Sequence, residues 1–271
     1  MATSAAIDKF RSAAGGYLND ERFSDFTIVC EGTEHKVHRC FIAAHSKWFE
    51  RACSGMFHEA SSQKVELQED LPTAVERMIR FFYTCDYDDA IDTTKPKPKY
   101  DDKEPSDRLQ VNAWMYATAD KYDVPSLKTL AVEKFAKLAL EASSHPMGLM
   151  PATHTVYKHI QLPESDRTLK DILTAMWMLG GKVLLGSKEI TLVSFATEVP
   201  EFMADLTRLT LTGSKPNVRQ VCKLCAWSGE TPRGTMMPGA FKCGRISCHG
   251  TESNDYVTLI STVTVKKPWL S

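Results

Sequence analysis

The stretch from residue 25 to residue 53 constrains the fold more than any other part of the chain. Asp25–Cys30 is rich in β-branched residues and predicts a strand. Glu31–Glu34 indicates a turn, and His35–His38 the start of a returning strand. From Arg39 to Cys53 the apolar residues change to a period near 3.6, which predicts one helix. We therefore expect an α+β domain that opens with a hairpin and a long amphipathic helix.

The elements that follow are also predicted from patterning. Residues 65–67 predict a short strand, and residues 109–120 predict a helix. Pro72 and Pro125 each stand where a helix begins. The helix that opens at Pro72 carries one apolar stripe at i, i+3, i+4 and i+7, made of Val75, Met78, Ile79 and Phe82.

Residues 86–107 interrupt this pattern. They contain eight acidic residues against four lysines, a net charge of −4, together with three prolines and few apolar residues. Such a composition cannot bury much apolar surface, so we expect a solvated, flexible insertion inside the domain. Its acidic beginning, residues 86–92, is expected to be a solvated face.

Charge and length exclude some classes of protein. The net charge of the whole chain is −1, which provides no global attraction for nucleic acid or for a membrane. No apolar run approaches 18 residues, and MATSAAIDKF lacks the pattern of a secretory signal. We therefore expect a protein of the cytoplasm, the nucleus or both. No nucleophile-elbow or zinc-protease motif is present, so we expect no enzymatic activity.

Several ordered segments resemble the BTB/POZ domain family. The opening SDFTIVCEGTEHKVHRCFIAAHSKWFERACSGMFHEA, the later AVERMIRFFYTCDYDD and the closing NAWMYATADKYDVPSLKTLA agree with that family in order and spacing. The resemblance covers residues 25–141, after an N-terminal lead at 1–24. It implies a cluster of helices flanked by a small sheet, usually paired as a homodimer. The insertion at 86–107 and the helical region that follows resemble those of fungal members.

The resemblance also implies a pair of opposite charges near the dimer interface. Asp25 and Arg39, fourteen residues apart, match that buried pair of the family. A buried ion pair is weak evidence for stability, although losing one partner is costly. The alternative is that Arg39 is a solvated residue at a helix N-terminus.

A second position carried over from the family is an apolar-x-Glu step, here Phe57-His58-Glu59. In members that act as substrate adaptors of cullin-RING ubiquitin ligases, this step helps to form the surface that binds the cullin. Such a surface needs an apolar knob to bury and a carboxylate for hydrogen bonds at the rim. Phe57 and Glu59 are thus candidate partner-binding residues for a cullin scaffold. The alternative is a helix-capping loop.

The second half of the chain predicts a separate helical region at 155–212, after a linker at 142–154. Its clearest helix carries an apolar stripe and is expected to end at Gly180-Gly181, read as a helix C-cap. Residues 188–197 predict another helix, and Pro200 is expected to begin a further one. A second linker is expected at Gly213–Pro216.

The eight cysteines divide into two groups of four. The first four are scattered among apolar residues, whereas Cys222-x2-Cys225 and Cys243-x4-Cys248 are clustered and separated by seventeen residues. Two thiolate pairs at this distance suit a tetrahedral structural zinc. Residues 217–271 are therefore predicted to form a small zinc-ribbon-like unit, with a final strand in YVTLISTVTV.

The identity of the fourth zinc ligand stays open. The second gap is wider than usual and His249 follows directly, so His249 could replace Cys248. Free cysteines in a coil and a redox CxxC pair are the remaining alternatives, although no βαβ pattern precedes the first pair.

These observations predict an interaction protein that pairs with a second copy and recruits an unknown cargo protein, with a cullin scaffold as a further candidate partner. The alternative is a nuclear regulator of transcription or chromatin whose basic C-terminal unit contacts nucleic acid. Residues 213–271 carry a net charge of +5. However, the basic residues there do not lie on one evident helix: Arg219, Lys223, Arg233, Lys242 and Arg245.

Overall fold

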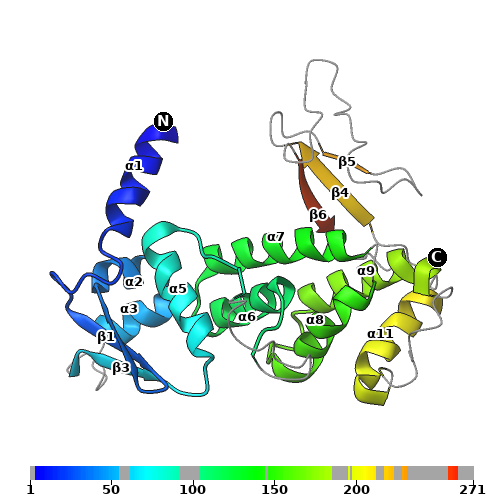
Figure 1. The fold of residues 1–271 in the computed structure, drawn as a ribbon, viewed down its shortest axis with the longest axis horizontal. Coiled ribbons are helices and arrows are strands. Elements are labelled where there is room, and N and C mark those ends of the chain that lie inside the picture. The colour runs from blue at the N-terminus through cyan, green and yellow to red at the C-terminus, as the bar shows by residue number, and fades with distance from the viewer. Residues whose placement is uncertain are drawn as a thin grey trace, which may run out of the picture. The chain divides into compact units, whose positions relative to one another are not determined.

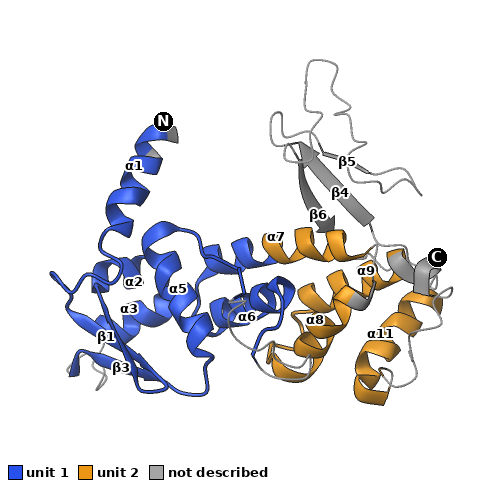
Figure 2. Cartoon of the chain, in the orientation of Figure 1, with its two compact units in different colours: residues 1–132 blue, residues 133–271 orange. Residues whose placement is uncertain are grey.

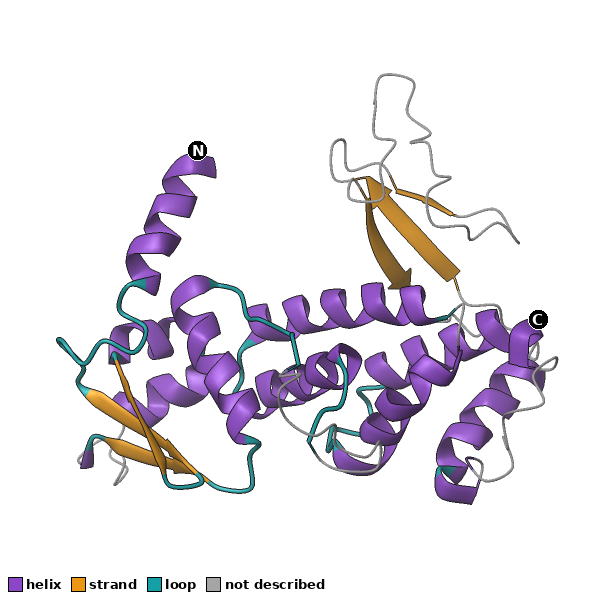
Figure 3. Ribbon diagram, viewed as in Figure 1, coloured by secondary structure: helices purple, strands orange, loops and turns teal. Residues whose placement is uncertain are grey.

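The computed structural model describes residues 4–54, 62–91, 104–143, 146–184, 195, 197–211, 217–222, 228–230 and 256–261. They divide into two compact units, residues 1–132 and 133–271, with the division inside one long helix (Figure 2). The secondary structure mixes helices and strands in both units, as the α+β prediction requires (Figure 3).

The first unit contains the following elements, in chain order (Figure 1). They are α1 (Ser4–Gly15), β1 (Phe26–Cys30), β2 (Thr33–Val37), α2 (Arg39–His45), α3 (Lys47–Ser54), β3 (Lys64–Leu67), α5 (Pro72–Thr84), α6 (Arg108–Lys121) and the first part of α7 (Pro125–Ala142). The strands and helices predicted at 25–38, 65–67, 72 onward, 109–120 and 125 onward are thereby confirmed.

The sheet of the first unit has the order β2-β1-β3. β2 pairs antiparallel to β1, with Phe26 opposite Val37, and β3 pairs parallel to β1, with Ile28 opposite Val65. Every residue of the central strand β1 is buried, although β-strand side chains alternate between faces. One face therefore packs on the helices, and the other is covered by side chains from the two edge strands.

The helical core of this unit is built around α5 and α6. The predicted stripe on α5 is buried throughout. α6 is buried on nearly all sides, since Leu109, Val111, Ala113 and Met115 all have exposed fractions of 6% or less. A helix without a polar face belongs in the interior of a domain.

One predicted helix is in fact two. The segment 39–53 breaks at Ser46, whose backbone is extended between α2 and α3 (φ −138°, ψ 120°). The buried Ser46 hydroxyl accepts a hydrogen bond from the backbone N–H of Phe49 and donates one to the carbonyl of Tyr122. Serine commonly caps a new helix in this way. The break depends on a residue 76 positions away, which local periodicity cannot reveal.

The beginning of the acidic insertion is a solvated face only in part, since Asp86 and Asp88 are exposed. Within 86–91, Tyr87 and Asp89 are buried, with Asp89 only 7% exposed. Asp89 accepts hydrogen bonds from Arg108 Nε at 2.8 Å and from Asn112 Nδ2 at 2.9 Å, and Tyr87 bonds Asn112. A buried carboxylate is tolerated when it is paired in this way. The acidic run is thus partly structural, and residues 92–103 lie outside the described residues.

The second unit begins with helical turns where a linker was predicted. η1 (Pro146–Leu149), α8 (Met150–His154) and the π-helix η2 (Thr155–His159) follow the end of α7. Ala152 and Thr153 are fully buried, so this segment contributes to the core. The prediction of a linker at 142–154 was wrong because Pro146 and Pro151 here stand in the first turns of short helices.

α9 (Thr168–Leu184) passes through Gly180-Gly181 and does not end there. Two glycines cost a helix about 2 kcal/mol in propensity, which tertiary packing readily overrides. The stripe of α9 is buried, and Trp177 donates from Nε1 to Thr153 Oγ1 at 2.9 Å. The helix expected at 188–197 lies mostly outside the described residues.

α11 (Pro200–Leu211) begins at Pro200 as predicted and packs against α9. The ring of Phe202 lies 5.4 Å from that of Trp177. Asp205 accepts from Tyr157 Oη at 2.9 Å and from Arg167 at 2.7 Å, and it also pairs with Arg208 at 2.9 Å. This network joins α11 to η2 and to the segment before α9.

A separate three-stranded antiparallel sheet has the order β5-β4-β6, with β4 (Asn217–Cys222), β5 (Ser228–Glu230) and β6 (Tyr256–Ser261). β6 confirms the strand predicted in YVTLISTVTV. The linker predicted at Gly213–Pro216 lies outside the described residues, so it stays a prediction.

Candidate interaction surface

Asp25 and Arg39 lie together, as the sequence comparison implied. Asp25 precedes β1, Arg39 opens α2, and Asp25 Oδ1 accepts a hydrogen bond from the backbone N–H of Arg39 at 2.8 Å. Asp25 is exposed and Arg39 half-buried, so within one chain this is not a buried ion pair. Its place in a dimer interface stays a prediction.

The guanidinium of Arg39 joins three elements. Nε donates to the main-chain oxygen of Asp25 at 3.2 Å, and Nη1 donates to the carbonyl of Cys53 in the last turn of α3 at 3.1 Å. The same group lies 5.4 Å from the centre of the Phe26 ring. Helix C-termini leave carbonyls without partners, and a cation is favourable there. Arg39 therefore fixes the start of β1 against the end of α3.

A buried histidine connects the loop before β1 to α5. The side chain of His38 is 5% exposed. Its Nε2 lies 2.7 Å from the main-chain oxygen of Arg22, and its Nδ1 lies 2.8 Å from Tyr83 Oη. Because a carbonyl oxygen only accepts hydrogen bonds, Nε2–H donates to Arg22, and Nδ1 and Tyr83 Oη form the second hydrogen bond. Burial raises the pKa of Tyr83 to about 12, so its hydroxyl keeps its proton at neutral pH.

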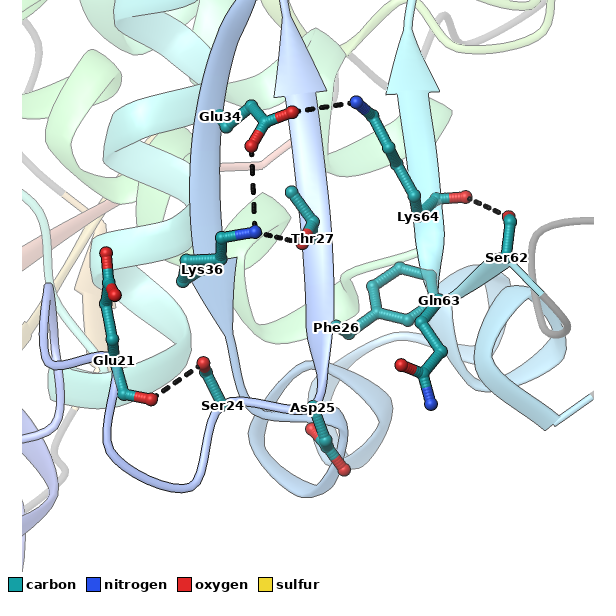
Figure 4. A pocket seen from close by; sticks show the side chains of 10 residues that line it. All are labelled: Glu21, Ser24, Asp25, Phe26, Thr27, Glu34, Lys36, Ser62, Gln63 and Lys64. Atoms are coloured by element: carbon teal, nitrogen blue, oxygen red, sulfur yellow. Dashed lines mark hydrogen bonds and ion pairs between the residues drawn. The ribbon is translucent and has the colours of Figure 1, made fainter.

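The outer face of the β2-β1-β3 sheet carries an open, polar pocket (Figure 4). Lys36 donates to Thr27 Oγ1 at 3.1 Å and lies 3.6 Å from Glu34, while Lys64 pairs with Glu34 at 2.8 Å. These charged side chains come from the two edge strands and cover the central strand. Because both lysines are already engaged by Glu34, this face is better explained as a cover for β1 than as a ligand site.

The N-terminal lead contains exposed apolar groups that the sequence analysis missed. Among the described large hydrophobic residues, five are exposed, and three of these fall between residues 10 and 23. They are Phe10 at 71%, Tyr17 at 38% and Phe23 at 82%. Helical spacing around Phe10 is the sequence signal that could have indicated this exposed apolar group.

The α1 helix is exposed along most of its length. Of its described side chains, those from Ala5 to Ala13 are exposed and Ala14 is buried. Gly15, at its end, approaches Thr84 at the end of α5, and this end holds α1 to the domain.

Two further candidate sites fall largely outside the described residues. The candidate partner-binding residues Phe57 and Glu59 lie outside the described residues. The nearest described residue before them is Ser54. Of the metal candidates, only the backbone of Cys222 is described, at the end of β4 opposite Tyr256, while Cys225, Cys243, Cys248 and His249 are not described. In the described ranges, no three His, Cys, Asp or Glu residues are grouped closely enough to hold a metal ion.

The four cysteines of the first unit carry free thiols: Cys30 and Cys53 are buried, and Cys40 and Cys85 are exposed. Burial raises the pKa of Cys53 to about 11. Over the part of the chain that the structure describes, none of the helices is both long enough and apolar enough to cross a membrane.

Comparison with known proteins shows which family the first unit resembles. A sequence model of the BTB/POZ domain family matches residues 15–138. Similar solved structures include the BTB (Tramtrack and Bric a brac) domain of human gigaxonin, at 17% identity, and the BTB domain of zebrafish PATZ1, at 16% identity. Each comparison covers 48% of this chain and 92% of the solved chain, with a TM-score of 0.35. The assignment of residues 15–138 to this family rests on the sequence match.

Proposed function

Residues 15–138 form a BTB/POZ domain, a protein–protein interaction module, and we propose that the chain acts without catalysis by pairing with a second copy and recruiting further proteins. The observation that carries the pairing is the exposed helix α1. A 12-residue helix is marginal in water unless it is packed against something. Apart from its last turn, the side chains of α1 that the structure describes are exposed within one chain.

The exposed face of α1 has the spacing of a helix-pairing seam. Ala6, Phe10 and Ala13 follow one another at intervals of four and three residues, and all three are exposed. We call these three residues the α1 seam. Alternating four- and three-residue intervals are typical of helices that pack side by side, and small residues next to a large one allow close approach.

The α1 seam contains no charged residue. A two-fold interface places the same patch on both partners, so the patch must be complementary to itself. An uncharged apolar seam can meet that requirement.

Sedimentation velocity on the full chain tests the pairing. We expect a species of twice the chain mass of 30.3 kDa, which dissociates on dilution. Phe10→Glu should give the monomer, because it places a charge in the α1 seam. Ser12→Glu adds the same charge to the same helix away from the seam and should leave the dimer intact. If Phe10→Glu and Ser12→Glu form dimers to the same extent, the role of α1 in pairing is refuted.

For the recruiting surface, we propose the segment that contains Phe57 and Glu59, with a cullin scaffold as the partner. Support comes from the sequence resemblance and from Arg39, which fixes the end of α3 directly before this segment. Capture of the full chain by a cullin N-terminal domain should fall with Phe57→Ala and with Glu59→Ala. It should persist with Glu50→Ala, which changes an exposed residue of α3. If neither of the first two changes reduces capture, the adaptor role fails.

We further propose that zinc holds the C-terminal unit through Cys222, Cys225, Cys243 and either Cys248 or His249. Cysteine spacing supports this proposal. Elemental analysis should find about one zinc per chain, and Cys225→Ser should remove it. A zinc content near zero in protein purified without chelator would refute the proposal.

A further inference from the structure

Two histidines meet where α8 continues into the π-helix η2. The ring centres of His154 and His159 lie 5.2 Å apart, and their planes are inclined at 58°. His154 is the last residue of α8, and His159 is the last residue of η2. The pair lies in the second unit, outside the residues that carry the proposed pairing and the proposed cysteine site.

The π turn is what brings these two side chains together. In an α-helix, residues five apart point in directions about 140° apart, so their side chains do not meet. The backbone N–H of Ile160 donates to the carbonyl of Thr155 at 3.0 Å, which is the i→i+5 hydrogen bond of a π-helix. This wider turn returns His159 to the side of His154. π-helical turns are rare, and they occur frequently at functional sites.

The two rings differ in their exposure. The side chain of His154 is 9% exposed, whereas His159 is half-buried. The first ring is thus held in the core, and the second is reached from solvent. A site for a small ion needs such an entry path and ligands that are already in position.

The core of the second unit holds the π turn on both sides of His154. The hydroxyl of Thr153, directly before it, accepts from Trp177 Nε1 on α9 at 2.9 Å. Within η2, Tyr157 Oη donates to Asp205 on α11 at 2.9 Å. These bonds tie the helix that carries the pair to two neighbouring helices. The positions of the two imidazoles are therefore fixed before any ligand binds.

From this geometry we propose that His154 and His159 bind one exchangeable zinc ion, at a site separate from the proposed cysteine site. Imidazole nitrogen is a preferred ligand of zinc, with Zn–N bonds of about 2.0–2.1 Å. Two imidazoles bound to one tetrahedral ion therefore have ring centres about 5 Å apart, which agrees with the 5.2 Å between these rings.

A pair of protein ligands holds an ion less firmly than a closed site does. In the described part of the chain, no third His, Cys, Asp or Glu joins this pair in a larger ligand group. Water then takes the remaining positions around the ion. Closed structural zinc sites have four protein ligands. Zinc at the histidine pair should accordingly exchange with free zinc and be lost during purification, whereas zinc at the proposed cysteine site is retained.

Equilibrium dialysis of the full chain against micromolar free zinc tests the proposal. The wild type should bind about one more zinc ion per chain than His159→Gln, which keeps a polar side chain but loses the imidazole. Lys158→Gln is the matched control, because it changes the exposed neighbour in η2 and should bind as much zinc as the wild type. Cys225→Ser should keep the ion at the histidine pair, since it alters only the proposed cysteine site.

Four results would overturn the proposal. If the wild type and His159→Gln bind the same amount of zinc, the two rings only pack against each other. An equal loss of zinc in Lys158→Gln would show that the imidazole is not the cause. If Cys225→Ser binds no zinc at all, every ion is held by the cysteines. In EDTA, His159→Gln should unfold at the temperature of the wild type, and a lower temperature would assign His159 to the support of its own chain.

Discussion

Helices α1 and α6 belong to the same unit and have similar lengths, but their surroundings are opposite. α6 is buried on nearly every side, whereas the described side chains of α1 are exposed up to Ala13. The packing of α6 comes entirely from its own chain. For α1, we propose that a second copy supplies most of the packing that a helix of this length needs. The difference separates a helix that its own chain packs from a helix proposed to be packed by a partner.

Truncation of a core residue in α6 should give the largest effect. Met115 is fully buried, and Met115→Ala should lower the free energy of unfolding by about 2–5 kcal/mol. Phe10→Ala in α1, measured by urea denaturation at a concentration where the chain is monomeric, should change it by less than about 0.5 kcal/mol. Similar losses for both variants would mean that α1 is packed within its own chain.

The next largest effect should come from the carboxylate that anchors the beginning of α6. Asp89→Ala removes the partner of Arg108 and of the buried Asn112, and should cost about 1–3 kcal/mol in urea denaturation. Asp88→Ala, on the exposed neighbour, should cost no more than about 0.5 kcal/mol. If both variants lose the same free energy of unfolding, the whole acidic run is a solvated face, as the sequence suggested.

A smaller effect concerns pH. Burial lowers the pKa of His45, at the end of α2, below its ordinary value of 6.5. His45 therefore stays neutral in the folded chain while the unfolded chain takes up a proton. The resulting stability is present above pH 6.5 and is lost as the pH falls through 6.5 towards the lowered pKa. His45→Gln should weaken this decline between pH 7 and pH 5.5, as measured by chemical denaturation. An unchanged decline would assign it to other groups.

The smallest effect is chemical rather than energetic. Cys53 is buried and its pKa is raised to about 11, whereas Cys40 and Cys85 are exposed. Pulse alkylation of the native chain at pH 8, followed by peptide mass mapping, should label Cys40 and Cys85 at least about tenfold faster than Cys53. Equal rates would indicate that α3 opens readily, against the tight packing expected of the core.

The sequence predicted those features that depend on neighbours along the chain. The β-branched run became β1, the stripe from Val75 to Phe82 is buried, and Asp25 meets Arg39. Each of these follows from periodicity or from a family pattern.

The features that sequence reasoning missed depend on partners far along the chain. Ser46 breaks a helix because Tyr122 accepts its hydroxyl, and Asp89 is buried because Arg108 and Asn112 pair with it. Phe23 gave no signal at all, because neither its φ nor its exposure is encoded in local composition. Such contacts become visible only in three dimensions.

Amide hydrogen exchange at two protein concentrations tests the central claim most directly. At a concentration well above the dimer dissociation constant, the hydrogen-bonded amides of α1 and of α6 should both be protected. After dilution to the monomer, α1 should exchange rapidly while α6 stays protected. Protection of α1 that does not depend on concentration, or α1 amides that exchange rapidly throughout, would contradict the account.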